Sequence, residues 1–187
     1  HQGDDSGTLW NLGISLTALS DWDGARATWS RLGFHLPGDS GEFGADGDLT
    51  AVRLRDKTGR AEIIWGLRIG PARVRLTGIP YYIGDYNFDD VVLIDGVSTG
   101  EVDGPDEKHP IFDCLGLHTP SGRLKYGLRW PSQDLRLEMM IETLASAGCA
   151  VADWRPLGEI TSYPMAAAPR DIDELARWTR LASDFGL

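Results

Sequence analysis

Two histidines and a cysteine are the residue types in this chain best suited to hold a metal ion or to carry out nucleophilic chemistry. They are spaced His-x4-Cys-x3-His, as His109, Cys114 and His118. Zinc prefers four ligands, usually in close pairs, whereas three side chains on an alternating strand would not all face one way. Cys114 and His118 would share a face but lie about 13 Å apart, too far for a base to activate a thiol. We therefore expect no metal, no cofactor and no catalytic residue here.

A second group of chemically capable residues is acidic. These side chains are Asp85, Asp89, Asp90, Asp103, Asp106 and Glu107. Their spacing lacks the ordered alternation of a calcium-binding loop, which favours solvated acids over a cation site. The chain also lacks a glycine-rich phosphate loop and a Gly-x-Ser-x-Gly motif. No constellation for catalysis emerges from these patterns.

Four aromatic residues fall within eight positions beside these acids, namely Tyr81, Tyr82, Tyr86 and Phe88. Such a composition is typical of an exposed binding loop, because aromatic side chains dominate interface energetics. Packing of two of these rings in the core is the alternative. The predicted binding residues are Tyr81, Tyr82, Asp85, Tyr86, Asp89, Asp103, Asp106 and Glu107.

The net charge of −10 is unevenly distributed. Residues 77–119 contain nine acidic side chains and one basic one, whereas residues 51–76 contain seven basic side chains and two acidic ones. An acidic chain argues against nucleic-acid binding, because phosphate attraction needs local positive charge. We expect the basic side chains to lie on the solvated faces of strands, although a local basic patch is the alternative.

The elements that must position these residues fall into an α+β arrangement. A helical hairpin is predicted within residues 1–34, with Ser6 as its N-cap, a stripe of Leu9, Leu12, Leu16 and Leu19, a break at Ser20-Asp21, and Gly33 as the end of its second helix. Residues 35–48 are rich in Gly, Asp and Pro and are predicted to be a linker. Residues 49–130 alternate in hydrophobicity and predict a small antiparallel sheet or barrel. The predicted strands are 49–55, 61–69, 73–79, 91–94 (ended by Asp95-Gly96), 110–117 and 124–130. A turn at Asp56-Lys57-Thr58-Gly59 is predicted after the first strand, with Gly59 available for a positive φ, and an acidic loop is predicted at 100–109.

The last part of the chain, residues 131–187, changes to an α/β pattern. An amphipathic helix over 132–147 precedes strands at 149–154 and 159–163, and Asp171 and Glu174 begin a last helix carrying Ile172, Leu175, Trp178 and Leu181. This order predicts a ferredoxin-like layer packed on the β-rich region.

Residues 6–33 resemble a tetratricopeptide repeat. The residues that carry this resemblance are Leu9, Leu12-Gly13 and Leu16 on the first helix and Trp22, Ala25 and Trp29 on the second. In such a hairpin the small residues let two helices approach while the aromatic rings fill the groove. A single hairpin cannot bury its own face, so either further repeats precede it or it docks on the rest of the chain.

From about Val52 to the end, the chain resembles a little-known bacterial family of unknown function, whose members are small acidic cytoplasmic proteins. The shared features are Glu62-Ile63-Ile64-Trp65, Gly78-Ile79-Pro80-Tyr81-Tyr82, the run Asn87 to Val92, and Gly148-Cys149 after a helix. The resemblance implies no activity.

These observations predict a soluble cytoplasmic protein that binds another protein. Two cysteines are too few for a disulfide framework, and no apolar run approaches the roughly 20 residues of a membrane helix. We expect a non-catalytic module with a basic protein partner, in one version an immunity or antitoxin-like protein that neutralises a basic toxin. The alternative is a small-molecule or nucleotide-processing enzyme with a site between the sheet and the C-terminal helices.

Overall fold

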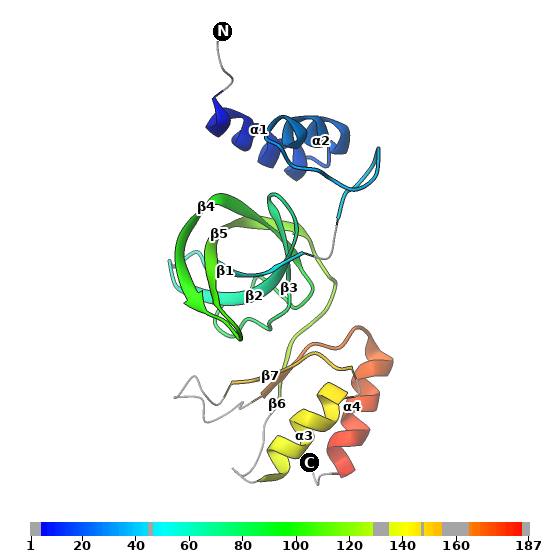
Figure 1. Cartoon of the computed structure of the whole chain (residues 1–187). Helices are drawn as coiled ribbons and strands as arrows, with labels where there is room; N and C mark the ends of the chain where they lie inside the picture. The colour runs from blue at the N-terminus through cyan, green and yellow to red at the C-terminus, as the bar shows by residue number, and fades with distance from the viewer. Residues whose placement is uncertain (1–4, 45–46, 129–134, 147, 155–164, 185–187) are drawn as a thin grey trace.

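The computed structural model describes residues 5–44, 47–128, 135–146, 148–154 and 165–184 of the 187-residue chain. The fold is α+β and has three parts: a helical hairpin, a closed β-barrel and a C-terminal unit on the opposite side of the barrel from the hairpin (Figure 1). The elements in chain order are α1 Ser6–Ala18, α2 Trp22–Arg31, β1 Leu49–Arg55, β2 Ala61–Gly70, β3 Arg73–Leu76, β4 Val91–Asp103, β5 Lys108–Thr119, β6 Tyr126–Leu128, α3 Leu135–Ser146, β7 Val151–Asp153, β8 Met165–Ala167 and α4 Ile172–Asp184. Among the described helices, none is both long enough and apolar enough to cross a bilayer.

The barrel is a five-stranded meander in which each strand pairs with the next one in antiparallel fashion. Strand direction alternates along a meander, so the first and fifth strands run the same way. The pair that closes the barrel, β1 with β5, is accordingly parallel. Its core contains Val52, Leu54, Ile64, Val74, Leu76, Ile83, Val92, Ile94 and Phe112.

Most of the predicted barrel strands are confirmed: residues 61–69 and 110–117 match β2 and β5, whereas β3 ends at Leu76 and not at residue 79. The predicted strand at 124–130 contains β6, which pairs in the C-terminal sheet and not in the barrel. β1 matches residues 49–55, and the predicted turn after it is present, with Gly59 at a φ of +87°. Asp95-Gly96 does not end β4, which continues to Asp103, and the predicted loop at 100–109 is mostly strand. The long β4–β5 pairing absorbs these turn residues in register shifts between Ile94 and Gly100.

The helical hairpin packs as predicted from its small residues. A Cβ atom on Gly13 would lie 2.7 Å from the Trp29 ring, so only glycine admits this approach. The N-cap is Asp5 rather than Ser6, because the Asp5 carboxylate accepts the Gly7 N–H at 3.1 Å. The predicted leucine stripe is only partly buried: Leu19 is 78% exposed, since α1 turns its Gly13 face toward α2.

The hairpin docks on the barrel through a shared apolar cluster. Trp29 and Ala25 of α2 are buried with Phe43, from the connection to β1, and Ala72, from the β2–β3 turn. That connection, predicted to be a linker, is held by Arg26, whose guanidinium donates to four of its carbonyl oxygens. The hairpin therefore buries its face against its own chain.

Arg73 corrects the expectation that the basic side chains of residues 51–76 are solvated. It is 1% exposed and lies against the rings of Trp22 and Phe43, 4.8 and 5.1 Å from their centroids. It also donates to the Phe43 carbonyl oxygen and to the Glu42 carboxylate. A guanidinium suits this position because it pairs with a carboxylate while stacking on aromatic faces, and it ties the hairpin to β3.

The C-terminal unit contains the three-stranded antiparallel sheet β6-β8-β7 and the helices α3 and α4, which share a buried cluster that includes Met140, Leu144 and Trp178. Gly148 ends α3 with a φ of +77°. The predicted strand at 159–163 lies outside the described residues, and Ile172, predicted on the apolar stripe of the last helix, is 74% exposed.

Candidate functional site

The candidate site is the segment between β3 and β4, residues 77–90, here called the tyrosine loop. It leaves β3 beside β2, because the Thr77 N–H donates to the Trp65 carbonyl oxygen at 2.9 Å. It returns to β3 where the Leu76 N–H donates to the Asp90 carbonyl oxygen at 2.9 Å. Both ends of the loop are thus part of the barrel's hydrogen bonding.

Glu62 of β2 holds one side of the tyrosine loop. Its carboxylate accepts the backbone N–H groups of Tyr81, Tyr82 and Ile83 at 2.8, 2.8 and 3.3 Å. Three successive N–H groups that converge on a carboxylate resemble the anion-binding turns of other proteins. Here the anion is the protein's own side chain, so the loop conformation is fixed from within.

Lys125 holds the other side of the loop. Its ammonium group donates to the carbonyl oxygens of Pro80, Ile83 and Tyr86 at 2.9, 3.0 and 3.4 Å. Burial lowers the pKa of Lys125 from its usual value, while the nearby carboxylate of Glu62 opposes that shift. An acid from β2 and a base from the segment before β6 therefore lock six backbone groups of one loop.

Most aromatic residues of the tyrosine loop are partly buried and pack against neighbouring hydrophobic clusters. Ile83 of the loop is fully buried in the barrel core, and Tyr86 packs against that core. Tyr81 and Phe88 pack against the cluster that joins the loop to the C-terminal unit, where the Tyr81 ring meets the Trp154 ring edge-on at 4.6 Å. Packing inside the molecule, the alternative expected for two of these aromatic rings, thus applies to much of the loop.

Tyr82 and Asp85 form the exposed tip of the tyrosine loop. Tyr82 is 45% exposed, and its ring is supported edge-on by Tyr81 at 4.5 Å. Asp85 is exposed two residues beyond the buried Ile83. Of the predicted binding residues within the loop, these two present their side chains most fully to a partner.

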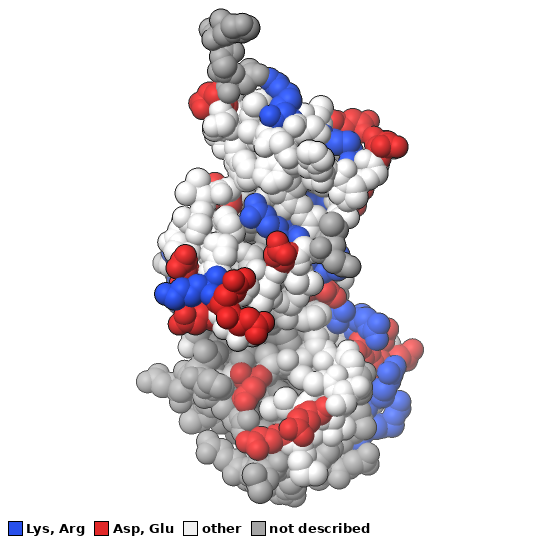
Figure 2. Space-filling model, in the orientation of Figure 1, with Lys and Arg blue, Asp and Glu red and all other residues white. Residues whose placement is uncertain are grey.

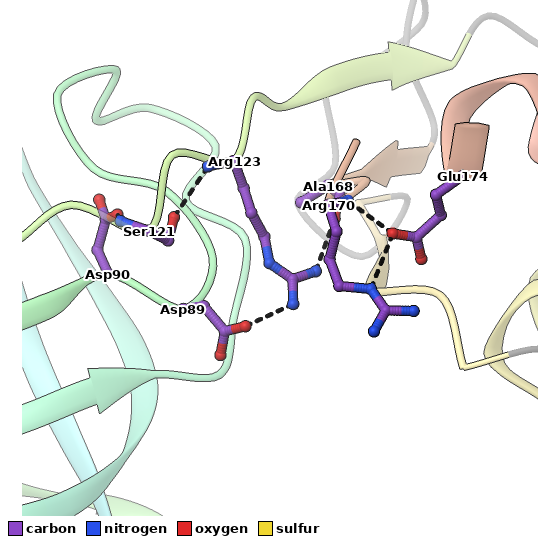
Figure 3. A network of polar contacts seen from close by, with 7 residues as sticks. All are labelled: Asp89, Asp90, Ser121, Arg123, Ala168, Arg170 and Glu174. Carbon is purple, nitrogen blue, oxygen red and sulfur yellow. Dashed lines mark hydrogen bonds and ion pairs between the residues drawn. The ribbon is translucent and has the colours of Figure 1, made fainter. Parts of the chain in front are cut away.

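Asp89 and Asp90 connect the loop to the segment that leaves the barrel. Asp90 is 1% exposed and accepts the N–H groups of Asn87 and Ser121, both at 2.7 Å. Asp89 has a φ of +66° and pairs with Arg123 at 2.5 Å (Figure 3). A partner that binds the Asp89 carboxylate would have to compete with Arg123 for it.

Asp103, Asp106 and Glu107 lie elsewhere, at the turn of the β4–β5 hairpin, and all three are exposed. Glu107 lines a pocket with Asp48, the residue before β1, and with Arg68 of β2. The contacts of the tyrosine loop involve Glu62, Lys125, Arg123 and Trp154 instead. The predicted site is therefore split between two loops.

The histidines and the cysteine considered for metal or nucleophilic chemistry each have a separate environment. His109 Nδ1 lies 2.9 Å from the Leu49 carbonyl oxygen, and His118 Nε2 lies 3.0 Å from the Thr17 carbonyl oxygen on α1. The Cys114 thiol lies 3.6 Å from the Tyr86 hydroxyl group, and burial raises the pKa of this thiol. A thiol kept protonated is a poor nucleophile.

The acidic character of residues 77–119 is partly neutralised in three dimensions. Arg53 pairs with Asp113 at 2.9 Å, in addition to the pair between Arg123 and Asp89. Figure 2 shows one face of the molecule, on which acidic and basic side chains are interspersed with broad uncharged areas between them. That face is therefore not uniformly acidic.

Glu62 and Lys125, which hold the loop, were not singled out by the sequence. Each lies in a predicted strand, where an isolated charged side chain is normally a solvated one. Their partners are backbone groups, which carry no sequence signature. No local pattern identifies such anchors.

Comparison with known proteins adds a distant similarity. No family model and no curated protein matches the chain. A solved structure of a hypothetical protein from Neisseria gonorrhoeae is similar to it with 14% identical residues, covers 74% of this chain and 88% of that chain, and has a TM-score of 0.35. The tetratricopeptide and bacterial-family resemblances stay expectations from the sequence.

Proposed function

We propose that the protein is a non-catalytic binding module that recognises a basic protein through the exposed tip of the tyrosine loop, Tyr82 and Asp85. The observation that carries this proposal is the double anchoring of the loop by Glu62 and Lys125. A rigid loop has already lost its conformational freedom, so a partner does not have to order it. A partly exposed tyrosine beside a carboxylate is a suitable contact for a cationic side chain.

The acidic hairpin turn with Asp103, Asp106 and Glu107 supports the choice of a basic partner. These side chains are exposed, and none has an ion-pair partner among the described residues. Unpaired surface charge attracts an oppositely charged protein before contact and orients its approach. An immunity or antitoxin-like protein that neutralises a basic toxin in the cytoplasm is the concrete version of this proposal.

Two finer assignments of the fold accompany the proposal. The close approach of Gly13 to Trp29 supports a tetratricopeptide-like hairpin. The sheet order β6-β8-β7, with α3 after β6 and α4 after β8, supports a ferredoxin-like layer whose order is β-α-β-β-α. We propose both as structural support for the loop and not as binding surfaces.

Site-directed photo-crosslinking tests the proposed contact. p-Benzoylphenylalanine at position 82, expressed in the native cells, is expected to trap one basic protein, with a yield that falls at high salt and after Asp85→Asn. The same probe at position 19, where Leu19 is 78% exposed, is the control for chance collisions. Equal yields of the same adduct from both positions would exclude Tyr82 as the contact.

The alternative function, a small-molecule or nucleotide-processing enzyme, has one observation in its favour. An open pocket of about 380 Å³ lies where the barrel meets the C-terminal unit, lined by Arg75, Asp89, Ser121, Arg123 and Arg170. The hypothesis from the sequence is a site between the sheet and the C-terminal helices. A screen for ligands that raise the melting midpoint tests this alternative, because a ligand that binds only the folded state stabilises it.

A further inference from the structure

We infer that the pocket between the barrel and the C-terminal unit binds an oxyanion, a phosphate or a carboxylate group, through Arg75, Arg123 and Arg170. The three arginines come from β3, from the segment before β6 and from the residues before α4. The inference concerns binding alone and does not depend on the proposed protein partner.

Arg123 is the fixed donor of this pocket. One of its terminal nitrogens donates to Asp89 at 2.5 Å and the other to the Ala168 carbonyl oxygen at 3.1 Å. Its guanidinium also lies over the Phe88 ring at 4.9 Å, and its side chain is only 15% exposed. A guanidinium held in this way needs little reorganisation to receive a ligand.

Arg170 reaches the same pocket from the other side. Its Nε donates to the Glu174 carboxylate at 3.2 Å, and the same carboxylate oxygen accepts the Arg170 backbone N–H at 2.6 Å. Figure 3 shows the guanidinium groups of Arg123 and Arg170 extending into one region between the barrel and the C-terminal strands. The terminal nitrogens of Arg170 have no partner among the described residues, and its side chain is 64% exposed.

Arg75 and Ser121 complete the set of donors. Arg75 is exposed and has no ion pair or hydrogen bond from its side chain within the described part of the chain. The Ser121 hydroxyl oxygen accepts the Arg123 N–H at 3.2 Å, which leaves its hydrogen available to a ligand. The planar donors of a guanidinium fit the oxygens of a phosphate or carboxylate two at a time.

The charges of the pocket favour an anion. Three guanidinium groups line it, whereas the nearby carboxylates of Asp89 and Glu174 each already pair with an arginine. Of the three guanidinium groups, only that of Arg75 is therefore left without a carboxylate partner among the described residues. Like charges in one pocket repel each other, and a bound oxyanion would relieve that repulsion.

An adjoining apolar pocket indicates what the anion is attached to. It has a volume of about 230 Å³, shares Arg170 with the arginine pocket, and is lined by Leu124, Tyr126, Ile172 and Leu175 among others. Leu124 and Ile172 are 63% and 74% exposed. The ligand class that fits both pockets is a small molecule with an apolar group next to a phosphate or carboxylate.

Titration with phenyl phosphate, followed by the NMR signals of the arginine side-chain N–H groups, tests this inference. We expect saturable shifts of the Arg123 and Arg170 signals, tighter binding than for inorganic phosphate, and no binding of phenol at the same ionic strength. Benzoate in place of phenyl phosphate shows whether a carboxylate is preferred. Absence of saturable binding of all three anions at millimolar concentrations would overturn the site.

The variant Arg75→Gln locates the binding. Because Arg75 has no partner to lose, the fold should be unaffected, while affinity for phenyl phosphate should fall about tenfold with one charged donor removed. Arg55→Gln is the matched control, since Arg55 is an exposed arginine on β1 that does not line the pocket. Equal losses in the two variants would show general charge attraction and refute a defined site. Equal affinities for phenyl phosphate and inorganic phosphate would refute the inference that the adjoining apolar pocket takes part in binding.

Discussion

Cys114 and Tyr86 show how burial decides the chemistry of individual residues. The tyrosine hydroxyl lies 3.6 Å from the thiol, and burial raises the pKa of both groups above their usual values. When the thiol ionises, the Tyr86 hydroxyl can donate a hydrogen bond to the thiolate. This hydrogen bond lowers the pKa of Cys114 and partly offsets the effect of burial.

Tyr86→Phe should accordingly raise the pKa of Cys114 further. We expect the rate of alkylation by iodoacetamide to reach its midpoint at a higher pH in the variant, measured in a Cys149→Ser background so that only Cys114 reacts. The sign follows from losing a donor to the thiolate. The midpoint, unlike the absolute rate, does not change with simple accessibility. A midpoint that moves down would contradict this assignment.

Within the helical hairpin, truncation of Trp29 should lower the free energy of unfolding the most. It is fully buried, and its indole N–H donates to the Thr17 hydroxyl at 3.1 Å. Trp29→Ala is expected to lower stability by about 3–5 kcal/mol, the range for large core truncations, measured by denaturant unfolding. Leu19→Ala, at an exposed position of the neighbouring helix, is the control. An unchanged unfolding midpoint for Trp29→Ala would mean that the hairpin does not contribute to the cooperative unit.

At the scale of elements, the tyrosine loop joins the barrel to the C-terminal unit. Its Ile83 enters the barrel core, and Ile79 belongs to the cluster with Trp154 and Ala168. The loop therefore joins two parts of the molecule, while its exposed tip carries the proposed contact with a partner. Its rigidity depends on the anchors Glu62 and Lys125.

Glu62→Ala should unlock the loop without unfolding the barrel. Three backbone N–H groups lose a charged acceptor, and a hydrogen bond to a charged group contributes about 1.5–3 kcal/mol. We expect faster amide hydrogen exchange at Tyr81, Tyr82 and Ile83, measured by NMR, with little change in β1. Glu101→Ala, an exposed acid on β4, is the control. Unaltered exchange at all three amides would show that the loop is held by its buried side chains alone.

The docking of α1 on β4 depends on a single glycine. A Cβ atom on Gly96 would lie 2.0 Å from the Trp10 ring, which is too close for any real contact. Gly96→Ala should therefore displace Trp10 and loosen the hairpin, seen as faster proteolysis between α2 and β1. Gly84→Ala, where the added Cβ meets no neighbouring atom, is the matched control. Equal protease resistance of both variants would contradict this docking mode.

At the scale of the whole molecule, the distribution of charge matters more than its sum. The net charge is −10, and the exposed acids that form no ion pair among the described residues include those of the hairpin turn and Asp85, while Arg75 in the arginine pocket has no carboxylate partner there. Charges separated by more than about 8 Å are screened at physiological salt. We therefore expect the charges of the hairpin turn and those of the arginine pocket to act independently of each other.

A triple variant tests the role of the acidic hairpin turn; it combines Asp103→Asn, Asp106→Asn and Glu107→Gln. It should slow association with the proposed basic partner far more than it speeds dissociation, because long-range attraction acts before contact. Stability should barely change, since exposed charges contribute little. Lys108→Gln at the same turn removes the opposite charge and should speed association. Both rates are measurable by surface plasmon resonance once the cross-linked partner is known. A triple variant that associates at the wild-type rate at low salt would refute electrostatic steering.

Features that depend on near neighbours in the chain were predicted well. The strand over residues 49–55 and its turn at Gly59, the helix ends at Gly33 and Gly148, and the start of the last helix at Asp171 are all present. Each follows from local physical chemistry: side-chain alternation, the access of glycine to positive φ, and a carboxylate that accepts a first-turn N–H. The α+β character followed from the order of these elements.

Features that depend on distant partners could not be predicted in this way. β4 runs through Asp95-Gly96 because β5 pairs along its length, and Arg73 is buried because aromatic rings from α2 and the following connection enclose it. Arg75, Arg123 and Arg170 meet only where the barrel contacts the C-terminal unit. The free energy of such contacts comes from groups far apart in the chain, whose proximity exists only after folding. Residue types and spacing therefore established the elements and the candidate acids and aromatics, whereas packing determined which of those side chains are available to a partner.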